Sequence, residues 1–384
     1  MLQHIVKDEK KVEYLELIYD LIFVYVIGRN NSLLHHVTDG FVGGGLFYAY
    51  VLCSLAIIQI WNFSTYYINM HGRNGLRDHV FLFINMYLLY YIAEGTRVHW
   101  QESHTQYHAA WALILINIGV QYLLELRNLK ACETVYAQTK RMVFVLFGEA
   151  AIVLAAIPVF RLTGFELAPA AILFGMLATM LHGKRAQVTL VDFTHLSERA
   201  MLYVVFTFGE MIIALAAYFE DSFSAVTFYF SLMSFLIVVG LFLSYGTLYD
   251  HLIDREQKST GLGYMAIHIV LIFAMNNITT ALEFMHDGEV HLLPKMLMMI
   301  GSLLLYYGAM FSLLHYKKSS CRPTLRFKLT VLGCAAVFAV LMLIFRENMY
   351  VNIALTAALT FGVFLLLYRW GQEKNAEFGM RNVE

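Results

Sequence analysis

The stretch RMVFVLFGEAAIVLAAIPVFR, residues Arg141 to Arg161, decides the fold class of this chain. Between its two arginines the only ionisable residue is Glu149. An α-helix needs about 20 consecutive, mainly apolar residues to cross the hydrocarbon core of a bilayer. The stretch is therefore predicted to be a transmembrane helix with Glu149 near its middle.

The composition extends this prediction to the whole chain. Of its 384 residues 59% are hydrophobic and only 14% are charged, and the mean hydropathy is +0.61. These values lie far from those of soluble domains, so a polytopic membrane protein surrounded by membrane lipids is expected. The net charge of −1 provides no concentrated basic face, so nucleic acid is not expected as a partner.

Eleven further stretches resemble the first in length and character. The twelve predicted spans lie at 14–36, 43–69, 79–99, 107–127, 140–161, 166–182, 196–218, 223–250, 262–285, 292–316, 327–345 and 349–370. The sequence thus predicts an all-α fold, a bundle of about 12 transmembrane helices over 14–370. It is preceded by a short segment, 1–13, and followed by a tail, 371–384.

Lys and Arg concentrate on every second loop between these spans. The loops of this set contain Arg73, Arg77, Arg127, Lys130, Lys140, Arg141, Lys184, Arg185, Arg255, Lys258, Lys317, Lys318, Arg322, Arg326 and Lys328. The other loops contain Arg29, Arg97, Arg161, Lys295 and Arg346. Positive residues are retained on the cytoplasmic side, so both termini are predicted to be cytoplasmic.

One pair of segments suggests an internal repeat. The span from Arg141 to Arg161 can be laid on the one from Arg326 to Arg346 with a constant shift, which also matches Gly148 with Gly333. Two parallel six-helix halves, 14–182 and 196–370, would explain the match, as in many transporters. Chance matching of apolar helices is the alternative. A competing similarity relates the fifth span to the seventh instead, since FGEAAIVLAA from residue 147 resembles FGEMIIALAA from residue 208.

Ionisable residues inside the spans are the best functional candidates. Inserting a charged side chain at the bilayer centre costs about 2.5 to 3.5 kcal/mol, so each such residue is expected to have a partner, a water-filled cavity or a functional role. Glu16 and Asp20, four residues apart, share one face of the first span near its cytoplasmic end. His195, Glu198 and Arg199 begin the seventh span at the same end. These residues form a predicted inner group.

Two glutamates are expected near mid-membrane, and polar stripes continue the series in other spans. Glu149 lies in the fifth span, and Glu210 lies about three turns beyond Arg199 in the seventh. Together with these acids, the predicted ion-coupling or polar path comprises Glu16, Asp20, Gln121, Glu125, Glu149, His195, Glu198, Arg199, Glu210, His268, Asn276 and Glu283. The alternative is structural. In this alternative the helix ends are stabilised by two ion pairs, Glu198 with Arg199 and Glu94 with Arg97, and we favour this role for both pairs. The amide side chains would form hydrogen bonds between helices.

Histidines cluster in the predicted outer loops. His104 and His108 have the four-residue spacing of paired metal ligands on a helix. We interpret them as water-exposed loop residues, with a metal site or a pH sensor as the alternative. The chain also lacks a Walker loop, an HExxH motif and a GxSxG elbow. We therefore assign no catalytic residue, no metal and no cofactor, and an enzyme is disfavoured.

Three motifs resemble those of the bacterial low temperature requirement A family of integral membrane proteins. They are YLELIYDLIFVYVIG from Tyr14, IWNFSTYYINM from Ile60 and HLSERAMLYVVFTFGE from His195 to Glu210. The resemblance covers most of the chain. Family members usually carry acidic residues just after the asparagine of the second motif, where this chain has HGRN, so a cation role for that loop is not carried over. The resemblance implies a multi-pass protein of the bacterial plasma membrane, named for a requirement in cold growth, and implies no established reaction or substrate.

The function predicted from these features is secondary transport. A relay of intramembrane acids would couple an unidentified small solute to protons. One alternative is an intramembrane enzyme that modifies a lipid or isoprenoid, with Glu16, Asp20, His195 and Glu198 as acid–base residues. A non-catalytic membrane sensor or scaffold is the third possibility. The oligomeric state stays open.

Overall fold

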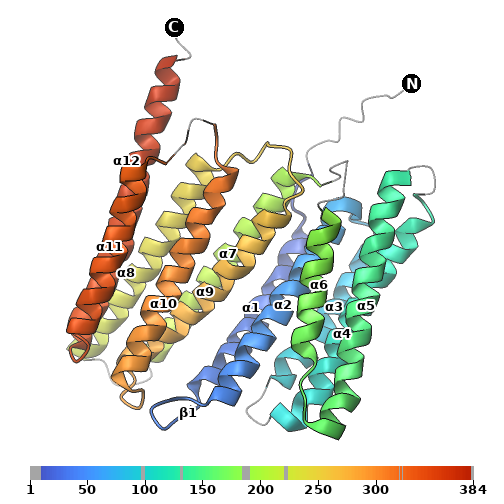
Figure 1. Ribbon diagram of the computed structural model, residues 1–384, viewed down its shortest axis with the longest axis horizontal. Helices are drawn as coiled ribbons and strands as arrows, with labels where there is room; N and C mark the ends of the chain where they lie inside the picture. Colours follow the sequence, from blue (N-terminus) through green and yellow to red (C-terminus); the bar gives the residue numbers. More distant parts are fainter. Residues whose placement is uncertain are drawn as a thin grey trace. The chain divides into compact units, whose positions relative to one another are not determined.

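The computed structural model describes residues 10–96, 100–129, 133–183, 191–219, 224–319, 321 and 323–381 (Figure 1). The described chain is almost entirely helical. Its α-helices are α1 (Tyr14–Asn31), α2 (Gly44–His71), α3 (Leu76–Gly95), α4 (Trp100–Leu126), α5 (Glu133–Thr163), α6 (Ala168–Gly183), α7 (Phe193–Ala214), α8 (Ala225–Thr247), α9 (Leu262–His286), α10 (Leu292–Ser312), α11 (Leu325–Ile344) and α12 (Met349–Arg381). The short 3₁₀ segments are η1 (Ser32–His35), η2 (Leu215–Phe219) and η4 (Leu313–Tyr316), and η3 (Leu248–Leu252) is a π-helical turn.

The predicted all-α fold with about 12 helices is confirmed, while the crossing of the membrane by all twelve stays a prediction. In the described residues, nine helical segments are long and apolar enough to cross a membrane. Of the remaining helices, α6 is short, with 16 residues, and α1 and α3 each carry three charged residues. In α1 the two acids point inward, since Glu16 and Asp20 are only 3% and 0% exposed. Their charge therefore does not face lipid.

The described chain divides into two compact units. The first contains the described residues of Met1–His36, Gly43–Tyr203 and Glu256–Ile269, and the second those of Val37–Val42, Val204–Arg255 and Val270–Glu384. The first unit thus holds α1 to α6 with the beginnings of α7 and α9. The six-helix halves proposed from the repeat stay a prediction.

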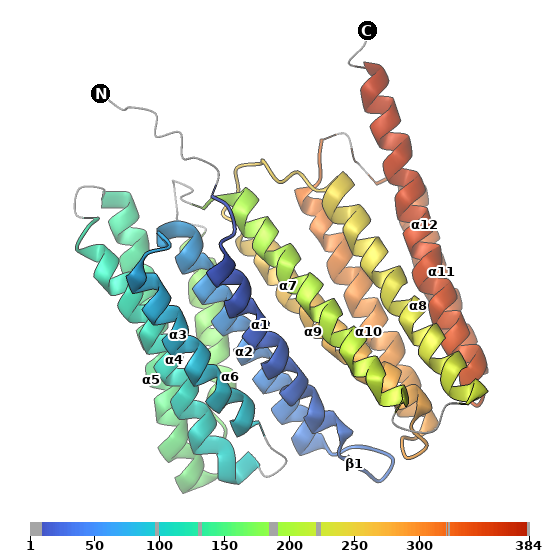
Figure 2. The ribbon, with the colours of Figure 1, turned by 180° about the vertical axis from the view of Figure 1, so that it is seen from behind.

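Helices in the first unit pack closely against one another. Helix α4 packs against α2, α3 and α5, while α1 packs against α2 and α3, and Figures 1 and 2 show these helices side by side. At Gly119 of α4, a methyl group would lie 2.9 Å from the ring of Phe147 on α5. Small residues at such crossings allow helices to pack closely without a hydrophobic driving force.

The second unit is built around α8 and α12, which pack together, with α11 against both α12 and α10. A methyl group on Gly240 of α8 would lie 2.5 Å from Oγ1 of Thr360 on α12. A two-stranded hairpin, β1 (Val37–Thr38) and β2 (Phe41–Val42), pairs Val37 with Val42. Helix α12 continues to Arg381, so the segment predicted as a tail begins as helix.

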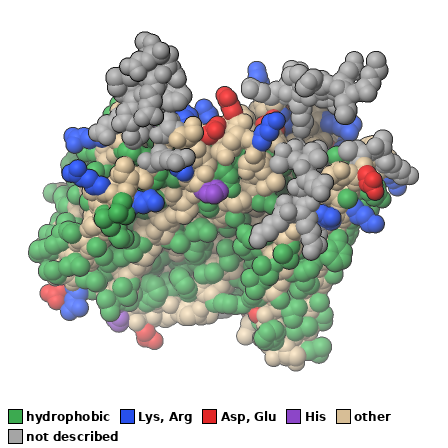
Figure 3. Space-filling model, turned by 45° about the horizontal axis from the view of Figure 1, so that its top comes forward, with side chains coloured by type: hydrophobic (Ala, Val, Ile, Leu, Met, Phe, Trp, Pro, Cys, Tyr) green, Lys and Arg blue, Asp and Glu red, His purple; other side chains and the backbone are tan. Residues whose placement is uncertain are grey.

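The surface has the distribution expected of a membrane protein. Figure 3 shows hydrophobic side chains over much of the visible surface. Exposed apolar residues include Phe144, Leu154 and Leu177, on α5 and α6. Exposed apolar surface of this extent is compatible with lipid, not with water. The cytoplasmic position of the termini stays a prediction.

Candidate functional site

The first two members of the site lie at the beginning of α1. Glu16 and Asp20 are one turn apart and are both buried in the first unit. Glu13 is the N-cap of this helix, and its backbone N–H donates to Oε1 of Glu16 at 3.3 Å in a capping box. The cap fixes the first turn, so the helix presents both carboxylates to the interior.

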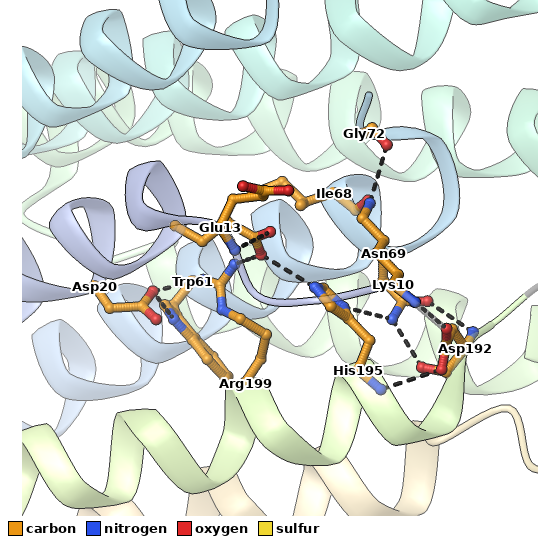
Figure 4. Close-up of polar contacts among 11 residues, drawn as sticks. Lys10, Glu13, Asp20, Trp61, Ile68, Asn69, Gly72, Asp192, His195 and Arg199 are labelled. Atoms are coloured by element: carbon orange, nitrogen blue, oxygen red, sulfur yellow. Dashed lines mark hydrogen bonds and ion pairs between the residues drawn. The ribbon is translucent and has the colours of Figure 1, made fainter. Parts of the chain in front are cut away.

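Arg199 of α7 bridges the two carboxylates. Its side chain is fully buried, Nη1 donates to Oε2 of Glu16, and Nη2 donates to Oδ1 of Asp20 at 2.6 Å (Figure 4). Arg suits this position because its planar guanidinium offers several donors in a fixed geometry. One buried cation thus faces two buried acids.

The indole of Trp61 on α2 is the next partner of Asp20. Its Nε1–H donates to Oδ1 of Asp20 at 2.9 Å, and its ring packs against Tyr203 with centroids 4.4 Å apart. Oδ1 of Asp20 therefore accepts from both Trp61 and Arg199. Oδ2 is buried and has no hydrogen-bond partner among the described residues.

The tautomer of His195 follows from Asn69. Oδ1 of Asn69 accepts the backbone N–H of Asp192 at 3.0 Å, and Nδ2 donates to the carbonyl of Asp192 at 2.8 Å. These contacts fix the amide, so Nδ2 also donates to Nδ1 of His195, 3.0 Å away. We therefore assign a neutral imidazole with its proton on Nε2, which faces Oε2 of Glu16 at 3.4 Å.

A second set of contacts ties the ends of α1, α2 and α7 together. Nζ of Lys10 donates to the carbonyl of Ile68 and, at 3.0 Å, to that of Gly72, at the end of α2. Asp192 accepts the backbone N–H of Lys10 at 3.3 Å and that of His195 at 3.1 Å. Figure 4 shows these residues converging on the cluster.

We call Glu16, Asp20, His195 and Arg199 the inner cluster. With both acids ionised, Arg199 charged and His195 neutral, its net charge is −1. A buried ion cluster is costly unless its charges and hydrogen bonds are compensated. One proton would complete this compensation.

The structure brings together the inner group predicted from the sequence, with one exception. Arg199 pairs with the acids of α1 and not with Glu198, which is half-buried. The predicted structural pair of Glu198 with Arg199 is therefore wrong, because neighbouring residues on a helix point in different directions. Trp61 and Asn69 were part of a recognised motif, but their hydrogen-bonding roles were not predicted.

The predicted mid-membrane pair falls in different units. Glu149 is fully buried in the first unit and accepts from Nε2 of Gln59 at 3.4 Å. Its Oε1 has no partner among the described residues. Glu210 is half-buried in the second unit and is repelled by the charge of Glu283. Asn276 is also buried in the second unit.

The polar stripe of α4 has a structural role. Glu125 is buried and forms ion pairs with Arg77 and, at 3.2 Å, with Arg73. Asn117 donates to Oδ1 of Asn85 on α3 at 2.8 Å. Asn117 and Glu125 therefore join α4 to α3 and to the loop before it, as the structural alternative predicted, and Gln121 is buried.

Two further predictions concern residues near helix ends. His268 is buried in the first unit, and its Nδ1 lies 2.8 Å from the carbonyl of Tyr264. Glu94 pairs with Arg29 at 3.6 Å. Its predicted partner Arg97 lies outside the described residues.

His104 and His108 are not water-exposed loop residues, as the sequence interpretation had them. Both are buried on α4, 1% and 0% exposed, and face the carboxylate of Glu166. Burial raises the pKa of Glu166, but the adjacent imidazoles of His104 and His108 lower it further, so it lies well below its usual range. Glu166, which follows α5, was not predicted from the sequence as a partner of these histidines.

Among the described residues, nine helical segments are compatible with a membrane, and a charge cluster is buried among helices; together they define the class, a multi-pass α-helical membrane protein. The family follows from a comparison of the sequence with protein families. The family model described as bacterial low temperature requirement A protein matches residues 11–365. The chain belongs to this family, which confirms the resemblance seen in its three motifs. No curated protein and no solved structure matches the chain.

Proposed function

We propose that this protein is a proton-coupled secondary transporter of a small solute and that Asp20 carries the coupling proton. The observation that supports this most directly is the arrangement at Arg199. Two carboxylates share one fully buried guanidinium, and Oδ2 of Asp20 is buried without a described partner. A proton on Oδ2 would make the inner cluster neutral without disturbing the contacts that Oδ1 makes.

Protonation of Asp20 would change how firmly α1 is bound to α7. A charge-assisted hydrogen bond is about twice as strong as a neutral one. With Asp20 ionised, the Asp20–Arg199 contact at 2.6 Å ties the two helices together. With Asp20 protonated, the guanidinium keeps only Glu16 as a charged partner. The cluster is therefore a two-state element that a single proton biases.

Glu149 is a second candidate proton carrier in the first unit. Its carboxyl accepts one amide hydrogen bond, and the described residues provide no ion-pair partner for it. An ionised carboxylate is expensive to bury with so little compensation, so the protonated acid is the cheaper form. In the second unit, Glu210 is half-buried and is repelled by the charge of Glu283, which makes it the corresponding candidate there.

The proposal is tested in proteoliposomes that contain a pH-sensitive dye. Pools of amino acids, sugars, organic acids and amines are added outside under an imposed pH gradient, and dye response reports proton movement that depends on each pool. At least one pool should drive proton movement with the wild type, and Asp20→Asn should abolish it. Glu133→Gln, at an exposed acid that begins α5 and lies outside the cluster and the predicted path, is the control and should retain it.

Two outcomes would contradict transport. If no pool moves protons with the wild type, or if Asp20→Asn equals the wild type for every pool, Asp20 does not couple protons to a solute. A deletion strain with a changed lipid profile and unchanged solute uptake would instead favour the intramembrane enzyme.

A further inference from the structure

Three side chains with metal-ligating atoms converge in the first unit, apart from the inner cluster. His104 and His108 lie one turn apart on α4, and Glu166 lies between α5 and α6. One ligand atom from each lies within 4.8 Å of the others. The side chains are 1%, 0% and 11% exposed. A largely covered carboxylate between two buried imidazoles favours a positive centre.

The distances between these atoms suit a metal. Nε2 of His104 lies 3.0 Å from Oε2 of Glu166, and Nε2 of His108 lies 3.3 Å from Oε1. Around a tetrahedral Zn²⁺ with bonds of about 2.0–2.1 Å, neighbouring ligand atoms lie about 3.3 Å apart. Small shifts would therefore bring the three groups around one ion.

The tautomer of His108 supports the same conclusion. Its Nδ1 lies 2.8 Å from the carbonyl oxygen of His104, which can only accept, so Nδ1 carries a proton. In the neutral ring, Nε2 then presents a lone pair to the carboxylate, and this atom has no hydrogen-bond partner among the described residues. Two acceptors facing each other at 3.3 Å repel unless a proton or a metal lies between them. An Nδ1–H bond to a carbonyl is the usual outer contact of a metal-bound His.

The surroundings hold the ligands in place. The ring of His104 is stacked between those of His108 and Phe160, with centroids 3.9 and 4.0 Å away. The backbone N–H of Ala168 donates to Oε1 of Glu166 at 3.1 Å and fixes the carboxylate. The exposed Arg161 donates to Thr105 and is not the counter-ion of Glu166. Ligands fixed by such neighbours are preorganised for an ion.

We propose that His104, His108 and Glu166 bind a divalent transition metal ion of the Zn²⁺ type. Two imidazoles and one carboxylate suit Zn²⁺ and its neighbours in the first transition row, whereas Mg²⁺ and Ca²⁺ prefer an all-oxygen shell. Three protein ligands leave one coordination position for water or another ligand. The site shares no residue with the inner cluster, so it goes beyond the proposed transport and is tested separately.

The test uses the purified full chain in detergent, stripped with a chelator and dialysed. Zn²⁺ is titrated by calorimetry, bound metal is counted by mass spectrometry, and Co²⁺ is added to detect the visible absorption of a tetrahedral site. The wild type should bind about one equivalent of Zn²⁺. His104→Gln and Glu166→Gln should each weaken binding by more than about 100-fold, since even outer-shell changes cost about 10- to 100-fold. His36→Gln, at an exposed histidine, is the matched control and should bind as the wild type does.

The Co²⁺ spectrum keeps the test independent of whether the variants fold, because it is recorded on the wild type. An intense tetrahedral band that Zn²⁺ bleaches would support the site. The proposal is overturned if the wild type gives no such band and binds no more Zn²⁺ than Glu166→Gln. In that case His108 carries a second proton, and the three residues form an ordinary imidazolium–carboxylate cluster.

Discussion

At the scale of single residues, Arg199 shows what the sequence could and could not predict. Its position one turn beyond His195, and that of Asp20 one turn beyond Glu16, follow from helical spacing, so each pair was expected to share a face. That these faces meet is a tertiary fact, since Arg199 and Glu16 are 183 residues apart. Sequence proximity suggested Glu198 instead.

Removing Arg199 should be strongly destabilising. Arg199→Met leaves two buried carboxylates without their cation, and breaking a buried pair in this way costs about 3–5 kcal/mol. Thermal unfolding in detergent should show the loss. The triple change Glu16→Gln, Asp20→Asn and Arg199→Met removes all three charges and should recover much of it. If Arg199→Met alone unfolds at the wild-type temperature, the ion cluster does not stabilise the fold.

Gly175 of α6 is a residue whose size matters. A methyl group there would lie 1.9 Å from Oε2 of Glu149 and 2.3 Å from Nε2 of Gln59. Gly175→Ala should therefore displace the Glu149–Gln59 contact and cost about 1–3 kcal/mol, as overpacking does. Gly209→Ala on α7 is the control, because its methyl group meets nothing within 4 Å and should be neutral or stabilising. Adding Glu149→Ala should relieve the strain of Gly175→Ala, and equal stability of the two glycine variants would argue against the close contact.

At the scale of elements, the helices were predictable and their partners were not. The hydrophobic runs place α2, α9 and α10 within a few residues of their predicted spans, because a helix that crosses a bilayer needs a minimum length of apolar sequence. The spacing of His104 and His108 pointed to a shared helix face, but Glu166 joins them from 62 residues away through the turn after α5. This contact depends on how α5 packs against α4, which the local spacing of residues does not determine.

A metal bound by these residues would link α4 to the segment between α5 and α6. A ligand that binds only the folded state stabilises it, by about 2.7 kcal/mol when present at 100 times its dissociation constant. Zn²⁺ should therefore raise the unfolding temperature of chelator-treated protein, and a chelator should reverse the rise. Glu166→Gln should abolish the response, while His36→Gln keeps it. A rise of equal size in all three proteins would indicate nonspecific binding.

At the scale of the whole molecule, composition alone established the membrane class, because a chain with so few charged residues cannot cover itself with polar surface. The same composition obscures internal symmetry, since apolar helices built from few residue types match one another readily. The distribution of Lys and Arg carries the remaining information, namely which ends of the helices face the cytoplasm.

Orientation determines what each site can meet, so it is the last prediction. If the Lys- and Arg-rich loops are cytoplasmic, Asn128 after α4 lies inside, and Leu162 near the end of α5 lies outside with Glu166. In a chain whose four cysteines are replaced by serine, Leu162→Cys, at a side chain 84% exposed, should react with a membrane-impermeant maleimide in intact cells. Asn128→Cys should react only after permeabilisation, and the cysteine-free parent should not react. The reverse pattern would put the inner cluster outside and the His104–His108–Glu166 site in the cytoplasm, where it would meet tightly buffered metal instead of the ions of the medium.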